Sequence, residues 1–273
     1  MYKQAKRDYM ISLKSSLSFI SILTFSLSRR TMASFATDKK CCIVVGLGNG
    51  GIGDHIAKKF SAEGYNVAMV ARSDLTVLEH EIPNSKSYIC DAGKPVDVVS
   101  TIKAIKGDMG DKIHALMYNV GAGVFKTFDD TSFEEFEHSW KVGPAGVFSW
   151  TKAVLPSMEA GGSIGITGAT ASWRGMAFTP AFASSKMATR GLAQALARDL
   201  GPSKGIHVFH VVIDGVVKTR SFQATMPNKA ENEVLDPGEI AETYWYLTQQ
   251  PPSCWTQETH VAAQGAFGTI ASI

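Results

Sequence analysis

A glycine-rich stretch at residues 46–53 decides the fold of this chain, and it reads Gly46-Leu47-Gly48-Asn49-Gly50-Gly51-Ile52-Gly53. It follows the apolar run Cys41–Val45 directly and precedes a helix-like segment, Asp54–Glu63. Glycine suits this turn because the turn demands positive φ angles, because the backbone must approach a ligand closely, and because a side chain would hold helix and strand apart. A strand, this turn and a helix in this order predict a pyrophosphate-binding site at a helix N-terminus. A merely flexible turn is the alternative interpretation.

Short apolar runs alternate with helix-like segments along the rest of the chain. Continuous apolarity without polar alternation is typical of parallel strands that are buried on both faces. The later strand candidates are Asn66–Ala71, Ala115–Tyr118, Ser163–Thr167 and His207–Ile213. The later helix candidates are Ser132–Met158 and Ala181–Leu200, the second of which we expect to stop at Gly201-Pro202. This order predicts an α/β fold, a Rossmann-type doubly wound parallel sheet, formed by a single domain over residues 40–273.

Composition limits the kinds of partner. The 273 residues include 27 basic and 25 acidic ones, so a net charge of +2 gives no field of one sign for nucleic acid or a membrane surface. We therefore expect a small-molecule substrate. The four cysteines form no CxxC pair and are expected to be reduced, buried thiols of an intracellular protein. His207 and His210 fall on opposite faces of one strand without further ligands nearby, so no metal site is predicted.

Residues 1–39 differ from the rest because they are basic, rich in serine and poor in acids. This composition predicts a disordered leader of the organellar transit type, while the apolar run Leu17–Leu27 also fits a short secretory segment. That run is too short for a stable membrane span. A third interpretation is that translation begins at Met32. The expected location is cytoplasmic or mitochondrial.

The end of the second predicted strand carries Arg72, within Met69-Val70-Ala71-Arg72-Ser73. Proteins that bind NAD usually have an acid here for the ribose hydroxyl groups, whereas arginine can form charge-assisted hydrogen bonds with the 2′-phosphate of NADP. Asp91 closes the third strand, where its carboxylate can bind the adenine amino group or simply form a turn. A solvated surface arginine is the alternative for Arg72. The pattern favours NADP(H) over NAD(H).

Together these motifs resemble those of the short-chain dehydrogenase/reductase family, from about Cys41 to the C-terminus. Tyr118-Asn119-Val120-Gly121 stands where the family has NNAG, Lys186 stands at the lysine of YxxxK, and Ile213-Asp214-Gly215 with Thr219 matches a Pro-Gly segment and a later threonine. The glycine loop is one residue longer than the family's GxxxGxG. The resemblance implies a cofactor site made of Gly46, Asn49, Gly51, Ile52, Gly53, Arg72, Asp91, Asn119, Gly121, Lys186, Gly215 and Thr219.

The sequence departs from the family at its catalytic positions. The tyrosine of YxxxK is Phe182 here, which has no phenol to exchange a proton, and the family's serine aligns with Ala169. Thr170 or Ser172 is the candidate replacement as a catalytic hydroxyl, with Tyr118 or a lysine-linked water as further alternatives; Ser172 also fits a turn-capping role. Lys186 is the remaining catalytic candidate, and it can bind the nicotinamide ribose even without a proton relay.

Two further segments are interpreted through the resemblance. The family's helical asparagine aligns with Gly143, and Pro144 after it predicts a kink within residues 132–158. The polar segment Arg220–Leu235 corresponds to a mobile lid over the substrate, and the resemblance implies a homodimer or homotetramer. The sequence thus predicts an NADP(H)-dependent oxidoreductase that moves hydride between nicotinamide and a carbonyl or alcohol. The alternative is a dinucleotide-binding regulatory or scaffold protein that has lost turnover.

Overall fold

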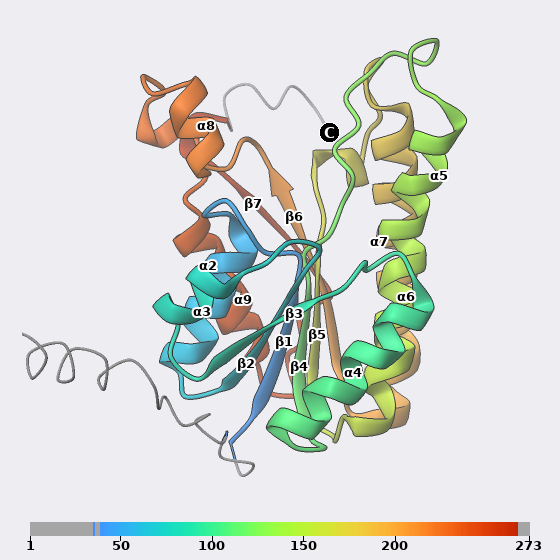
Figure 1. Cartoon of the computed structure of the whole chain (residues 1–273). Helices are drawn as coiled ribbons and strands as arrows, with labels where there is room; N and C mark the ends of the chain where they lie inside the picture. The colour runs from blue at the N-terminus through green and yellow to red at the C-terminus, as the bar shows by residue number, and fades with distance from the viewer. Residues whose placement is uncertain (1–34, 36–38, 267–273) are drawn as a thin grey trace, which may run out of the picture. The chain divides into compact units, whose positions relative to one another are not determined.

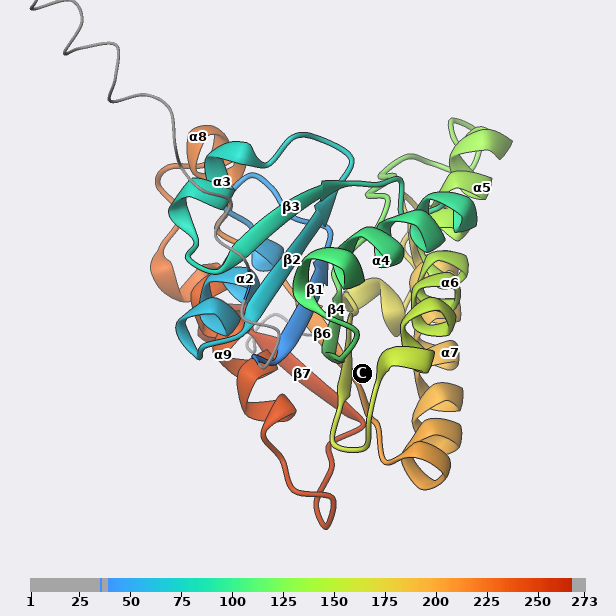
Figure 2. The same ribbon diagram turned by 60° about the horizontal axis from the view of Figure 1, so that its bottom comes forward.

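A parallel β-sheet runs through the described part of the computed structural model, which comprises Phe35 and residues 39–266. These residues belong to the unit Phe35–Ile273. The sheet has seven strands in the order β3-β2-β1-β4-β5-β6-β7, and every neighbouring pair is parallel (Figures 1 and 2). The strands are β1 (Cys41–Val45), β2 (Asn66–Ala71), β3 (Ser85–Ile89), β4 (Ile113–Tyr118), β5 (Ser163–Thr167), β6 (His207–Asp214) and β7 (Glu258–Ala262).

Helices cover both faces of this sheet, which confirms the predicted doubly wound α/β fold. Helices α2 (Ile52–Ala62), α3 (Thr76–Glu81) and α9 (Pro237–Thr248) lie on one side (Figure 1). On the other side lie α4 (Pro95–Met109), α5 (Phe133–Val142), α6 (Pro144–Val154) and α7 (Pro180–Lys204). The short helix α8 (Arg220–Thr225) follows β6. No helix among the described residues is long and apolar enough to cross a membrane.

Strand β1 shows why the central strands are apolar throughout. Cys42 and Val44 belong to the core between the sheet and helices α2 and α9, which contains Phe60 and Tyr244. Cys41, Ile43 and Val45 belong to the opposite core, with Trp150 of α6. Successive side chains of a strand point to opposite faces, so a strand covered on both sides needs an apolar residue at every position.

The helix predicted over residues 132–158 is interrupted at Gly143. Helix α5 ends there and α6 begins at Pro144, which has no N–H to continue the first helix. Side chains also bind carbonyl groups at this break: Tyr118 donates to the oxygen of Val142 at 2.6 Å, and Ser185 donates at 2.6 Å to the oxygen of Ser139, which also accepts the N–H of Gly143. The break is therefore fixed by the strand and helix behind it.

Two predictions about local structure are wrong. Helix α7 does not stop at Gly201-Pro202 but continues to Lys204, because Pro202 lies in its last turn and Gly205, with φ of 64°, closes the helix. Cys254 was expected to be buried with the other cysteines, yet it is exposed on the connection between α9 and β7, whereas Cys41, Cys42 and Cys90 are buried. The leader predicted at residues 1–39 lies outside the described residues, apart from Phe35 and Lys39.

Candidate functional site

Two cavities open at the carboxyl ends of the parallel strands. The first, of about 590 Å³, lies over β1, β2 and β4, and the second, of about 1090 Å³, lies over β5 and β6. Gly121, which follows β4, lines both cavities. They meet where the strand order reverses between β1 and β4, which is the usual ligand position in an open parallel sheet.

The glycine loop lies between the two cavities and has the backbone that its sequence predicts. Gly46, Gly48 and Gly50 have φ angles of 93°, 132° and 64°, and Asn49 joins them in the left-handed region with φ of 63°. A Cβ on Gly53 would collide with the carbonyl oxygen of Gly46, so only glycine allows α2 to approach β1 this closely. Gly46 lines the first cavity and Ile52 the second.

The loop is held from within by Asp54, a residue that the sequence reasoning did not select. Its buried carboxylate accepts the backbone N–H of Gly48 at 2.5 Å and that of Gly50 at 2.8 Å. Carboxylates are favoured in the first turn of a helix, which gave a signal for this contact in the sequence. Asp54 thus fixes the loop conformation and places a negative charge beneath it.

Besides Gly46 and Gly121, the first cavity brings together three more of the predicted cofactor residues. Arg72 is exposed at its rim after β2, and Asp91 lines it with a carboxylate that also accepts the N–H of Gly93 at 3.0 Å. Asn119 donates from its side chain to the carbonyl oxygen of Gly46 at 2.8 Å and so ties β4 to the glycine loop. This cavity can hold a nucleoside between Arg72 and the loop.

The second cavity contains Lys186 at its base. The ammonium group donates to the carbonyl oxygen of Thr167 at 2.8 Å, and the side chain is only 7% exposed. Burial lowers the pKa of Lys186 to about 8, because desolvation disfavours the charged form. Gly121 leaves room for it, since a Cβ there would lie 3.2 Å from the nitrogen. Gly215 and Thr219 also line this cavity.

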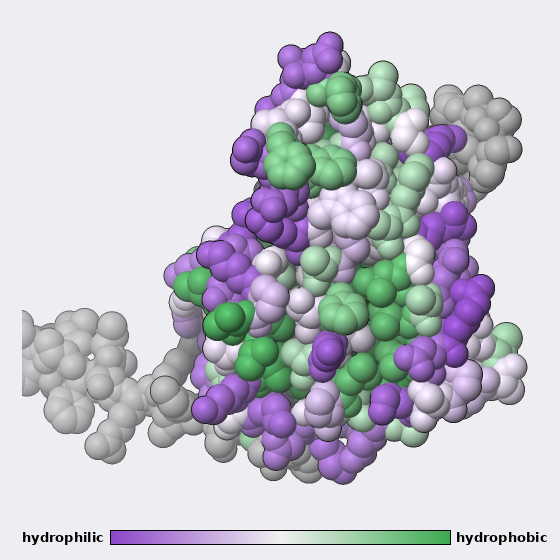
Figure 3. All heavy atoms as spheres, turned by 90° about the vertical axis from the view of Figure 1, so that its right-hand side faces the viewer, coloured by the Kyte–Doolittle hydropathy of each residue, from purple (hydrophilic) through white to green (hydrophobic). Residues whose placement is uncertain are grey.

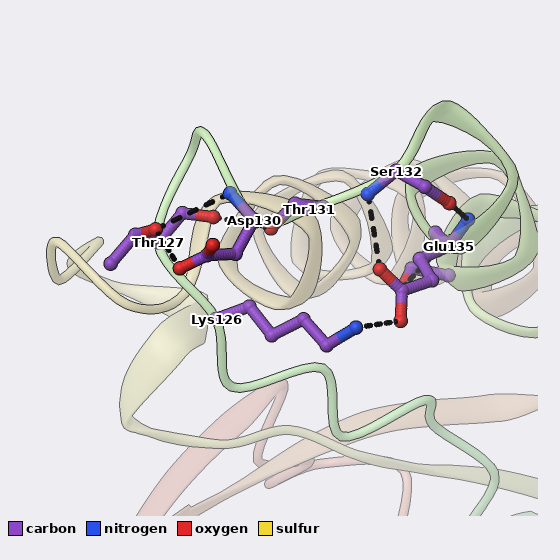
Figure 4. Close-up of polar contacts among 7 residues, drawn as sticks. Lys126, Thr127, Asp130, Thr131, Ser132 and Glu135 are labelled. Atoms are coloured by element: carbon purple, nitrogen blue, oxygen red, sulfur yellow. Dashed lines mark hydrogen bonds and ion pairs between the residues drawn. The ribbon is translucent and has the colours of Figure 1, made fainter.

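Phe182 occupies the wall beside Lys186. Its ring centroid lies 5.8 Å from the lysine nitrogen and 5.3 Å from the ring centroid of Phe125. Phe125 belongs to the loop between β4 and α5, which polar contacts shape. Lys126 pairs with Glu135 at 2.6 Å, and Ser132 forms a capping box with the same glutamate at the start of α5 (Figure 4). An aromatic pair therefore stands at the position where the family that the sequence resembles has its tyrosine.

The three candidate hydroxyl groups fall in different places. Thr170 lines the second cavity and donates to the carboxylate of Asp214. Ser172 is buried and accepts the N–H of Ala169 at 3.1 Å, and it is not among the residues that line either cavity. Tyr118 is buried against Val142, and burial raises its pKa. Of these three residues, Thr170 is the one that lines a cavity.

Asp214 and His260 are polar residues near the site that the sequence reasoning missed. Asp214 ends β6, and its second carboxylate oxygen lies 3.2 Å from Nε2 of His260 on β7. Thr170, Asp214 and His260 thus form a hydrogen-bonded chain that begins at the cavity, and the His260 side chain is 23% exposed. An acidic residue at the carboxyl end of a buried strand, in Ile213-Asp214-Gly215, was the available signal.

A second polar cluster supports the floor beneath Gly168. Glu258 accepts two hydrogen bonds from Arg190, both at 2.8 Å, and one from Nδ1 of His210 at 2.9 Å. Burial lowers the pKa of His210 and favours its neutral form, although the hydrogen bond to Glu258 opposes this. The described residues contain no cluster suited to a metal ion.

The comparisons with known proteins agree with this geometry. The family model described as short chain dehydrogenase matches residues 40–230. Carbonyl reductase family member 4 from Xenopus laevis is 25% identical over 223 residues, covering 78% of this chain and 92% of that protein. A short-chain dehydrogenase structure from Rhodopseudomonas palustris is 32% identical, covers 81% of this chain and 97% of its own, and has a TM-score of 0.66.

A third similar protein is an alcohol dehydrogenase from the archaeon Thermococcus sibiricus, whose structure was determined with 5-hydroxy-NADP. It is 26% identical, covers 82% of this chain and 96% of its own, and has a TM-score of 0.71. The family match, the sheet order and the position of the two cavities agree with one another. The chain belongs to the short-chain dehydrogenase/reductase family of oxidoreductases.

Proposed function

We propose that this protein is an NADP(H)-dependent oxidoreductase that interconverts a carbonyl compound and an alcohol. The observation that carries the proposal is the pair of cavities that meet at Gly121, with Arg72 at one end and Lys186 at the other. The residues present fit an extended dinucleotide that crosses the glycine loop between the two cavities. The loop keeps this shape because residue 53 is glycine, where a Cβ would collide with the carbonyl oxygen of Gly46. When bound, NADP(H) supplies or accepts the hydride.

The chain's own residues would hold the cofactor from both sides. Arg72 provides guanidinium donors for a 2′-phosphate, which is the basis for preferring NADP(H) to NAD(H). Asp91 and Asn119 line the first cavity, which would hold the adenosine part of the cofactor. Lys186 is fixed by its hydrogen bond to the carbonyl oxygen of Thr167. Its remaining N–H donors would bind hydroxyl groups of the nicotinamide ribose in the second cavity.

Thr170 is the residue that we propose for proton transfer in place of a phenol. Because its hydroxyl donates to Asp214, a lone pair of Oγ1 is free to accept. In alcohol oxidation, the substrate hydroxyl group would give its proton to Thr170 Oγ1 while the Thr170 proton moves to Asp214, and the bound cofactor would supply the hydride acceptor. Carbonyl reduction runs the same transfers in reverse, and His260 exchanges the proton of Asp214 with solvent.

The walls of the second cavity favour an apolar substrate. Large apolar residues line it, among them Phe125, Met176, Phe178, Phe182, Val216 and Val217. Such side chains bind hydrocarbon or aromatic groups through burial of apolar surface, and the polar atoms near Thr170 and Lys186 can orient a single oxygen. We therefore propose an apolar ketone, aldehyde or secondary alcohol as the substrate class.

A second candidate function, favoured by Phe182, is regulatory dinucleotide binding without turnover. The deciding experiment measures NADPH binding by fluorescence titration and NADPH consumption with a panel of apolar ketones and aldehydes. Binding together with consumption supports the oxidoreductase. Tight binding without consumption of any carbonyl supports the regulatory binder, and absence of binding overturns both.

We also propose that the protein forms homodimers or homotetramers through the face made by helices α4–α7. Apolar side chains interrupt the hydrophilic surface on this side (Figure 3). Among the exposed residues of α5 and α6 are Trp140 and Phe148, which are 40% and 51% exposed. Light scattering during gel filtration tests this, and Phe148→Glu should reduce the measured mass to that of the monomer.

A further inference from the structure

Arg220, the first residue of α8, lies against the glycine loop. Its backbone N–H donates to the carbonyl oxygen of Asn49 at 3.0 Å. Its Cγ and Nε lie 3.1 and 3.3 Å from the position that a Cβ on Gly50 would occupy. The side chain of Asn49 donates to Ser221 in the next position of the helix. The start of α8 is therefore docked on the middle of the loop.

The negative charges around this loop favour a positive charge at the position of Arg220. The carboxylate of Asp54, 3% exposed, lies beneath the loop and accepts the N–H groups of Gly48 and Gly50. A pyrophosphate placed on the loop adds two negative charges beside this buried one. Arg72 and Lys186 line the two separate cavities on either side of the loop, whereas Arg220 places its charge at the loop itself.

Arg220 also has the freedom and the chemistry for this task. Its side chain is exposed, and the residue before it, Thr219, lines the second cavity. A planar guanidinium group can donate two parallel hydrogen bonds to phosphate oxygens, which an ammonium group does not do. It would thus offset the charge of Asp54 and of the ligand together.

We infer that Arg220 binds the cofactor pyrophosphate, and that the docking of α8 on Asn49 completes this phosphate site. The inference rests on the proposed dinucleotide binding and adds a residue from the lid segment to it. Because NAD(H) and NADP(H) share the pyrophosphate, Arg220 serves both cofactors equally. Arg72, in contrast, serves the 2′-phosphate, which only NADP(H) carries.

The test separates these two arginines by binding alone. The full chain and its variants Arg220→Gln and Arg72→Gln are titrated with NADPH, NADH, ADP-ribose and adenosine 2′-monophosphate. Loss of one charge-assisted hydrogen-bonding group should weaken binding about 10- to 100-fold. Arg220→Gln should weaken NADPH, NADH and ADP-ribose by the same factor and leave adenosine 2′-monophosphate unchanged. Arg72→Gln should weaken NADPH and adenosine 2′-monophosphate alone.

Lys218→Gln is the matched control, since it removes a positive charge two residues earlier on the same segment, where Lys218 lies 4.0 Å from Glu231. It should leave every affinity within about twofold, because a screened surface charge contributes little. Arg220→Lys should keep the fold and recover only part of the ADP-ribose affinity, which also decides the matter if the glutamine variant unfolds.

Unchanged ADP-ribose binding in a folded Arg220→Gln protein overturns the inference, and so does an equal loss in Lys218→Gln. Such results leave the proposed function intact as long as the unmodified chain binds NADPH. Failure of the unmodified chain to bind NADPH or NADH instead overturns the proposed function itself.

Discussion

The ammonium nitrogen of Lys186 lies 2.8 Å from the carbonyl oxygen of Thr167, at the carboxyl end of β5. This hydrogen bond holds a charged group at the base of a cavity whose walls are largely apolar. The contact fixes the direction of the side chain but does not offset its loss of water, because burial still lowers the pKa of Lys186 to about 8. A group kept at this energetic cost is expected to serve ligand binding rather than stability.

Replacing Lys186 should therefore stabilise the unliganded protein. At about pH 7 the folded chain carries a buried charge that Lys186→Met removes, so we expect the free energy of unfolding to increase by about 2 kcal/mol after the lost hydrogen bond is subtracted. Between the folded pKa of about 8 and the ordinary value of 10.5, the unfolded chain binds more protons. The stability of the unmodified chain thus rises with pH in this window, and the difference from the variant shrinks.

Urea denaturation at a series of pH values from about 7 to 10 measures this difference. Lys218→Met serves as the control, because it removes a lysine whose side chain is 37% exposed rather than buried. A Lys186→Met variant that is less stable at every pH would contradict the expected cost of burial.

The glycine loop gives a contrast between two neighbouring glycines. A Cβ on Gly53 would collide with the carbonyl oxygen of Gly46, whereas one on Gly51 would lie 3.3 Å from the oxygen of Gly48, a contact that a small shift relieves. Gly53→Ala should therefore lose stability by about 1–3 kcal/mol and lose NADPH binding, while Gly51→Ala should stay folded with a smaller loss of affinity. Thermal unfolding and cofactor titration of both variants check this; equal behaviour of the two would show that the loop is only a flexible turn.

Arg72 should decide the choice between the two cofactors. We expect NADPH to bind more tightly than NADH, because Arg72 is exposed at the rim of the first cavity. Arg72→Ala should reduce the difference in binding free energy between NADPH and NADH by about 1.5–3 kcal/mol, the contribution of a charged hydrogen bond, and leave NADH affinity unchanged. Fluorescence titration with each cofactor measures this. Equal or tighter binding of NADH by the unmodified chain would exclude the assigned role of Arg72.

Thr170 and Ser172 make a matched pair for the proton step. Thr170 lines the second cavity, whereas Ser172 is buried with its oxygen bound to the N–H of Ala169. Thr170→Val keeps the shape and removes the hydroxyl, so turnover should fall by about 10²–10⁴ with little change in NADPH affinity. Ser172→Ala should mainly lower stability. Steady-state rates with one apolar ketone distinguish them, and the reverse pattern would assign the proton step to Ser172.

The strand pattern and the glycine loop were predictable because both depend on local sequence. Buried parallel strands need continuous apolar runs, and the positive φ angles of the loop require glycine at positions that the sequence displays. The break at Gly143 was only partly predictable. Pro144 marked the kink, but its geometry depends on Tyr118 and Ser185, which come from other elements.

The polar chain behind Thr170 was not predictable from any local pattern. Asp214 and His260 are 46 positions apart in sequence and lie on adjacent strands, so only the sheet register brings them together. The contact of Arg220 with Gly50 is likewise created by the fold, since α8 returns to a loop near the start of the chain. Such contacts depend on topology rather than on residue type or spacing.

Phe182 is the residue that separates an oxidoreductase from a binding protein. Its ring contacts Phe125 and lies beside Lys186, so the position retains the family's proximity to the lysine but has no proton to give. A positioned acid or base contributes about 10²–10⁴ in rate. If Thr170 replaces the phenol only in part, activity on common ketones should be weak although NADPH binds.

Restoring the phenol tests this relationship directly. Phe182→Tyr adds one hydroxyl at the cavity wall near the lysine nitrogen, whose charge favours the phenolate, so the rate should rise at least about tenfold, at the low end of the effect of a positioned acid. Phe125→Tyr, which adds the same group to the neighbouring ring, is the control and should not raise the rate. Cofactor titration and thermal unfolding first establish that each variant binds NADPH and is folded. A fast unmodified enzyme that Phe182→Tyr slows would show that Thr170 already supplies the full proton transfer. Tight NADPH binding without turnover in either protein would instead support a regulatory dinucleotide-binding protein.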